Sequence, residues 1–205
     1  MSANNSFPRT GRCPCLRQKG TAAVEFALLA AIFFTLVFGI IETARLMYVY
    51  NTLQEVTRRA AAAAANVYPG NTTRIQQVKQ DAVFRNSPGE LVLASPVTDK
   101  NIRIDYLALT RETPTGAMTL TKVDESALPK CPAQNRQTCM RDPHANNCIR
   151  FVQVQVCDTA HTDSCRPVTS QMLLSFVDMR VPLHRATTIT PVESLGYELG
   201  MLPCP

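Results

Sequence analysis

The sequence predicts an α+β fold in which a long N-terminal helix packs on a small antiparallel β-sheet. The helix is indicated by an apolar run whose continuation repeats at three- and four-residue steps as far as about Asn66. The sheet is indicated beyond Gly89, where the period changes to two, most clearly where Val152, Val154 and Val156 alternate with glutamines. A helical part followed by a run of strands is typical of the α+β class.

The first part of the helix has the composition of a membrane span. Ala22 to Ile41 contains one ionisable residue, Glu25, and about 20 helical residues cross the ~30 Å hydrocarbon core. The leader, residues 1–20, has four basic residues and no acid, so the positive-inside rule predicts a cytoplasmic leader and an exported chain beyond Tyr48. A cleaved signal peptide is the alternative. The long apolar run, with no convincing small-x-small site after residue 41, favours retention in the membrane.

The second part of the helix is predicted to be amphipathic and to carry the exported domain on one face. Its apolar residues recur at helical spacing, it contains a run of six alanines, and Pro69-Gly70 ends it. The recurring positions are Leu46, Tyr50, Leu53, Val56, Ala60 and Ala63. We therefore expect three parts: a leader over 1–20, a transmembrane and amphipathic helix over 21–66, and an exported disulfide-containing domain over 67–205.

The exported part is predicted to contain one more helix and four strands. The helix covers Thr73 to Phe84, with Asn71 or Thr72 as its N-cap. The segment Pro129 to Asn147 is predicted to be a polar loop that disulfides hold in place. The strands are expected around Ile102–Ala108, Met118–Leu120 and Val152–Val156, and in a last strand that includes Val181, Leu183 and Arg185 to Ile189.

Cysteine use agrees with export. Cys13 and Cys15 lie in the leader, on the reducing side, and an even number remains beyond the span, which is typical of a disulfide framework. Six cysteines allow 15 pairings. Cys157 and Cys165 flank a short polar loop, so this pair is favoured. The six candidates are Cys131, Cys139, Cys148, Cys157, Cys165 and Cys204.

Charge and motifs argue against nucleic-acid binding and catalysis. The net charge is +5, of which the leader supplies four, so the rest is nearly neutral and lacks a basic stripe. Cys131, Cys139, His144 and Cys148 lack the CxxC spacing of a zinc site. The residues that follow His161 are of the types found in a Ser-His-Asp catalytic triad. Residues adjacent in one loop do not have the geometry of such a triad. We expect no metal, no cofactor, no catalytic residue and no enzymatic activity.

The segment around the start of the span resembles a known family. Gly20, Thr21 to Leu28, Phe38 to Glu42, and Arg45 resemble the TadE-like pseudopilins of bacterial tight-adherence (Flp-type, type IVb-like) pilus systems. The close resemblance covers about Lys19 to Ala65. It implies a pilin-like fold and a minor pseudopilin that serves as a structural subunit in pilus assembly.

The resemblance also implies processing, partners and a location. A prepilin peptidase of the inner membrane would cut after Gly20, Thr21 would become the new N-terminus, and Glu25 would be the fifth residue of the mature chain. Other pilins or pseudopilins, the assembly machinery and membrane lipid would be the partners. The subunit would cross the inner membrane once, with a cytoplasmic N-terminus and a periplasmic C-terminal domain, before any incorporation into an extracellular pilus.

Two charged features have a physical interpretation of their own. Glu25 lies about 6 Å of helix rise from Thr21, near the cytoplasmic interface, where a neighbouring subunit's α-amine could pair with it and set the axial register. The alternative is a carboxylate without a role. Glu42 and Arg45 are spaced for an i,i+3 ion pair, either local or part of an interface.

The alternative to a pseudopilin is an uncleaved bitopic protein with a periplasmic binding or scaffold domain. A membrane-anchored enzyme has no residues to support it.

Overall fold

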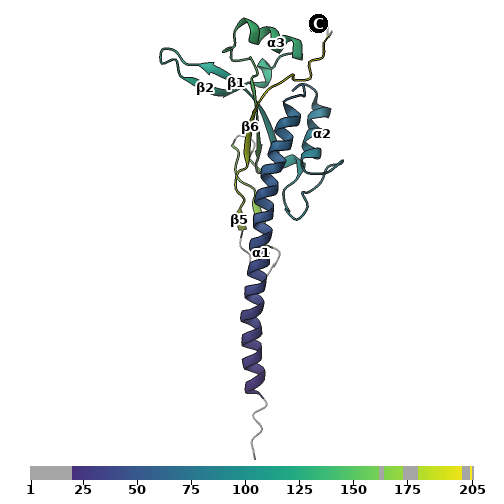
Figure 1. Ribbon diagram of the computed structural model, residues 1–205, viewed down its shortest axis with the longest axis vertical. Coiled ribbons are helices and arrows are strands. Elements are labelled where there is room, and N and C mark those ends of the chain that lie inside the picture. Colours follow the sequence, from purple (N-terminus) through teal and green to yellow (C-terminus); the bar gives the residue numbers. More distant parts are fainter. Residues whose placement is uncertain (1–19, 162–163, 173–179, 200–203, 205) are drawn as a thin grey trace, which may run out of the picture. The chain divides into compact units, whose positions relative to one another are not determined.

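The computed structural model describes residues 20–161, 164–172, 180–199 and 204 (Figure 1). The contacts divide the chain into two compact units, Met1–Ile41 and Glu42–Pro205. Residues 1–19 of the leader, with Cys13 and Cys15, and Asp163, two residues after His161, lie outside the described residues. The predicted α+β class is confirmed, because a long apolar helix is followed by a small antiparallel sheet.

Helix α1 runs from Thr21 to Ala64, within two residues of the predicted end. Its part in the second unit supplies the core: Val49, Leu53, Val56 and Ala60 are at most 1% exposed. The alanines at the end of α1 have no bulk to separate the helix from its neighbours, so they allow close packing while favouring the helical conformation. Of the predicted amphipathic stripe, Leu53, Val56 and Ala60 are buried and Leu46 and Tyr50 are partly buried, whereas Ala63 is exposed.

Helix α2, Thr72–Ala82, begins where Asn71 caps it, because the Asn71 side chain accepts a hydrogen bond from the Arg74 backbone N–H at 3.1 Å. Val78 and Ala82 are buried on its inner face. The helix stops two residues before the predicted Phe84, which has a positive φ of 60° and cannot continue it. Figure 1 shows α2 beside the C-terminal part of α1.

The main sheet has the strand order β2-β1-β3-β6, and all neighbours are antiparallel. Ile102 faces Val156 and Ile104 faces Val154 across the β1–β3 ladder, so the predicted alternation places one apolar face toward α1. On the same face the Thr57 hydroxyl of α1 lies 2.9 Å from the Thr188 hydroxyl of β6. The strands are β1 Ile102–Arg111, β2 Met118–Lys122, β3 Phe151–Val156 and β6 Thr187–Pro191.

Two expectations about the second half of the domain are wrong. The predicted last strand is two strands in different sheets: β5, Arg180–Pro182, pairs with β4, Thr169–Gln171, whereas β6 joins the main sheet. The residues that separate β5 from β6 include the buried Leu183. Leu183 and Ala186 are both buried and lie three positions apart, so the period-two alternation changes phase at this break.

The segment Pro129 to Asn147 is not a loop, because it contains helix α3, Pro132–Arg141. Its Pro132 lies in the first turn, where a missing N–H costs nothing. The helix has few apolar residues, and it buries Asn135, whose amide oxygen accepts from the Ile149 N–H at 2.9 Å. Because a polar side chain holds this helix in place, its sequence has no hydrophobic periodicity that could predict it. Short 3₁₀ turns, η1 Asp99–Asn101 and η2 Glu125–Ala127, complete the fold.

Candidate functional site

The predicted processing position lies at the very start of α1. Gly20 directly precedes the helix, and its carbonyl accepts a hydrogen bond from the Val24 N–H at 3.3 Å. A side chain at position 20 would meet no described atom within 4 Å. The Gly20–Thr21 peptide bond is therefore exposed at a helix end, where the first turn can open without disturbing a packed core.

Glu25 is exposed in the first unit, among exposed apolar side chains of α1. The structure gives it no ion pair with another described residue. The first turn of α1 contains no acid, so Glu25 is the first carboxylate after the helix start. A lone carboxylate on an apolar helix surface is a candidate for pairing with a partner.

The apolar half of α1 fits a membrane span. Among the described residues, α1 is the one helix long and apolar enough to cross a bilayer, by length and composition. Its large apolar side chains are mostly exposed, as lipid or partner helices would require. They are Val24, Phe26, Leu28, Leu29, Ile32, Phe33, Phe34, Leu36, Phe38, Ile40 and Ile41.

Glu42 and Arg45 form an ion pair at the start of the second unit, with Oε1 and Nη1 2.9 Å apart and both side chains at most 11% exposed. Arg45 also donates to two backbone carbonyls, through Nε to Leu93 at 3.1 Å and through Nη1 to Gln171 at 2.9 Å. The spacing alone predicts the local pair. The two carbonyls come from segments distant in sequence, so no pattern indicated that Arg45 ties α1 to the Leu93 loop and to β4.

The six cysteines beyond the span form three disulfides. Cys131 pairs with Cys204, Cys139 with Cys148, and Cys157 with Cys165, with Cα–Cα distances of 5.8, 5.0 and 4.9 Å. The favoured pair, Cys157–Cys165, is among them. No group of residues able to hold a metal ion occurs in the part of the chain that the structure describes. His144 instead places Nδ1 3.2 Å from the Leu109 carbonyl.

The largest stability effect among the disulfides is expected from Cys131–Cys204. It joins residues 73 positions apart, against eight for Cys157–Cys165, and the chain-entropy relation gives about 4 and about 2.5 kcal/mol for loops of these lengths. Removing both cysteines of the long loop should lower the unfolding free energy more than the matched change Cys157→Ser with Cys165→Ser. Urea unfolding of the full chain measures the unfolding free energy of both variants.

Thiol alkylation of the denatured, unreduced chain should label none of the six cysteines beyond the span. Labelling of two or more of them would contradict the three disulfides.

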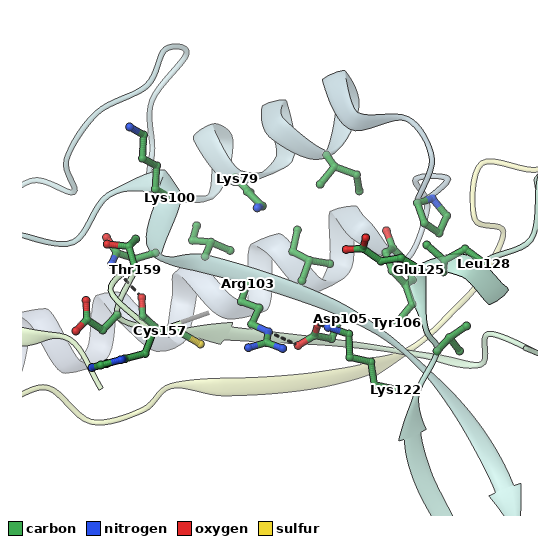
Figure 2. Close-up of a pocket in the computed structure, with 18 residues that line it drawn as sticks. Lys79, Lys100, Arg103, Asp105, Tyr106, Lys122, Glu125, Leu128, Cys157 and Thr159 are labelled. Carbon is green, nitrogen blue, oxygen red and sulfur yellow. Dashed lines mark hydrogen bonds and ion pairs between the residues drawn. The ribbon is translucent and has the colours of Figure 1, made fainter. Parts of the chain in front are cut away.

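A cavity of about 480 Å³ lies between α2, β1 and the loop after β3 (Figure 2). At its floor the Asp105 carboxylate is held by Arg103 at 2.9 Å and Lys122 at 2.7 Å. Its wall carries both signs of charge, and apolar side chains complete it. The other charged or titratable lining residues are Lys79, Lys100, Tyr106, Glu125, Asp158 and His161. The sequence analysis missed this cavity. Asp105, an acid within a β-strand pattern, was the one available signal.

Burial shifts two titrating groups at this cavity. Desolvation lowers the pKa of Lys79, while the charges of Asp99 and Asp105 act in the opposite direction. Burial raises the pKa of Tyr106, whose hydroxyl donates to the Val67 carbonyl at 3.3 Å.

Lys79→Met is expected to stabilise the domain at neutral pH. Below its lowered pKa Lys79 is protonated in both states, and the folded state carries the whole cost of desolvating the ammonium. This cost falls as the pH rises from the lowered pKa toward the unfolded value of 10.5, so the advantage of the variant should disappear there. The Tyr106 effect above pH 10 is common to both proteins and cancels in the comparison.

Urea unfolding at a series of pH values tests this. The control is Lys100→Met, which removes an exposed lysine of the same cavity. A variant advantage that grows with pH would contradict the assigned cause.

The fold and the N-terminal segment together define a class: a chain compatible with a single membrane span, whose apolar helix continues into the core of a disulfide-bonded antiparallel domain. Within that class, the model of the TadE-like protein family matches residues 20–62. The match confirms the resemblance and begins at Gly20. It associates the chain with tight-adherence pilus systems. No curated protein and no solved structure matched the chain.

Proposed function

We propose that the protein is a minor pseudopilin-like structural subunit for the assembly of a tight-adherence pilus, and that a prepilin peptidase processes it after Gly20. One observation supports this most directly. The family match starts at Gly20, the residue directly before α1, and includes Glu25 on the exposed apolar surface of that helix. A cut there would release a helix whose first residue carries a free α-amine.

The proposed role of Glu25 follows from the charges at such an end. The N-terminus of a helix carries a partial positive charge, so a new α-ammonium on Thr21 is unfavourable there without an anion. The first turn of α1 has no acid, so the Glu25 carboxylate of a neighbouring subunit would neutralise the ammonium. The same pairing would compensate the free-energy cost of desolvating the Glu25 carboxylate. Pairing between subunits would fix their axial offset.

The remaining assignments of this proposal concern location and partners. The chain crosses the bacterial inner membrane once with its leader in the cytoplasm, as the leader's positive charge favours. Its domain is periplasmic, where the three disulfides are stable. The partners are the prepilin peptidase, other pilins or pseudopilins, the assembly machinery and membrane lipid. The role is structural and involves no catalysis.

The intact mass of the protein purified from membranes of its host tests the processing step. We expect the mass of a chain that begins at Thr21. A mass that includes residues 1–20, or a chain that begins beyond residue 41, would contradict the proposal.

A second candidate function is an uncleaved bitopic protein with a periplasmic binding or scaffold domain. The charged cavity between α2 and β1 is the observation in its favour. Retention of the leader in the purified protein, together with normal pilus yield in a deletion strain, would favour this second candidate.

A further inference from the structure

The domain exposes two apolar side chains at the tip of a loop that Arg45 holds against α1. Val92 is 55% exposed and Leu93 is 62% exposed, whereas Leu91 and Ala94 on either side are buried. The loop is closed by hydrogen bonds from the Leu91 N–H to the Val97 carbonyl and from the Ala94 N–H to the Leu91 carbonyl. The buried flanks fix the loop, so the two exposed residues are presented to the exterior.

The conformation of Leu93 supports a role for this exposure. Its φ is 59°, in the left-handed region that non-glycine residues rarely adopt. A glycine or asparagine would be the ordinary residue at such a position. A large apolar residue held there, with its side chain in solvent, combines two unfavourable features that a contact with an apolar medium would offset.

The height of the loop along α1 follows from Arg45. Side chains of a helix lean toward its N-terminus, and the Arg45 guanidinium accordingly lies beside Glu42, 2.9 Å from its carboxylate. The same guanidinium binds the Leu93 carbonyl at 3.1 Å. The Leu93 end of the loop therefore lies beside the Glu42–Arg45 pair, and Glu42 is the first residue after the uncharged run that ends at Ile41.

We infer that Val92 and Leu93 insert into the lipid interface next to the end of the membrane span, which gives the domain a second membrane contact besides α1. The inference depends on the proposed membrane span. The lipid surface is the fitting occupant because Arg45, which binds the loop, follows the end of the apolar run by four residues in the sequence. Tyr48 of α1, 43% exposed and three residues after Arg45, lines one groove with Val92 and extends the apolar surface. Glu42 is ion-paired with Arg45, so it does not present a bare negative charge to the headgroups.

Tryptophan fluorescence can test this contact, because the chain contains no tryptophan. The full chain carrying Leu93→Trp is reconstituted in nanodiscs of phosphatidylethanolamine and phosphatidylglycerol. Some nanodiscs contain lipid brominated close to the headgroup and others lipid brominated at the chain ends. An interfacial side chain lies about 5–10 Å inside the headgroup boundary, so the shallow bromine should remove about half or more of the emission and the deep bromine much less. Val92→Trp repeats the measurement at an ordinary backbone position.

Two control probes make the outcome decisive. Leu120→Trp replaces a leucine of β2 that is 43% exposed, and it should be quenched only by water-soluble acrylamide. Phe33→Trp lies in the apolar half of α1 and should be quenched by the deep bromine. If bromine quenches Phe33→Trp but the probes at positions 92 and 93 are quenched only by acrylamide, as Leu120→Trp is, the proposed lipid contact is wrong and the membrane span is supported. If Phe33→Trp is not quenched either, the span itself is wrong. Protection of positions 92 and 93 from acrylamide without bromine quenching would mean a protein contact and would also overturn the inference.

Discussion

Replacing Gly20 with leucine is expected to leave the leader attached to essentially every molecule while the folded chain is unaffected. The folded chain can accommodate leucine, since a side chain at position 20 meets no described atom within 4 Å. The protease is expected to be blocked, because it approaches the backbone closely where the residue before the cut is a glycine without a side chain. The defect should therefore appear in processing alone. The measurement is the ratio of uncut to cut protein in host membranes, by intact mass.

Gly39→Leu is the matched control for this change. It alters another glycine of α1 where the structure leaves equal room, and its leader should be removed as in the unaltered chain. Efficient removal of the leader from the Gly20→Leu protein would mean that the cut lies elsewhere or does not depend on this glycine.

Glu25→Ala is expected to leave insertion and membrane level unchanged or improved, and yet to reduce pilus assembly strongly. Removing a charge from an apolar helix favours the monomer in the membrane. In the assembled state the same change leaves the neighbour's α-ammonium without its partner, which is costly for a buried charge pair. Glu25→Gln should act in the same way, since it keeps the size and loses the charge. Pilus yield and cross-linking between subunits measure the effect.

The control for Glu25 is Glu55→Ala, which removes another carboxylate from α1. Glu55 is exposed and lies 3.7 Å from Arg59, and such a surface pair contributes little, so assembly should be unaffected. Membrane level and leader removal must first be normal in all variants. Wild-type assembly with both Glu25 variants would show that the carboxylate has no role between subunits.

Local periodicity was sufficient to predict α1, α2 and the strands with a buried face. In β3 each of Val152, Val154 and Val156 is buried, and the sequence alternation indicated this directly. It failed for α3, because Asn135 and a disulfide anchor that helix instead of an apolar stripe. Leu183 and Ala186, which lie between β5 and β6, are both buried and three positions apart, so one continuous period-two strand could not place both on the same face.

The candidate site divides in the same way. Gly20, Glu25 and the Glu42–Arg45 pair are close together in sequence, so spacing could indicate them. The clamp of Arg45 on Leu93 and Gln171, and the binding of Asp105 by Lys122, join residues distant in sequence. Their partners depend on how the chain folds back, which one sequence without its fold does not specify.

The Cys131–Cys204 bond also determines how the domain would respond to mechanical tension. A pull on the chain at Cys204 passes through the disulfide directly to Cys131, so the intervening residues, which include β3, β4, β5 and β6, are not stretched. At about 3.3–3.6 Å per extended residue, the protected segment would otherwise release roughly 250 Å of chain. Force applied at Cys204 would reach the domain through the segment before Cys131, which contains β1 and β2, and the extensible length of the domain is shortened accordingly.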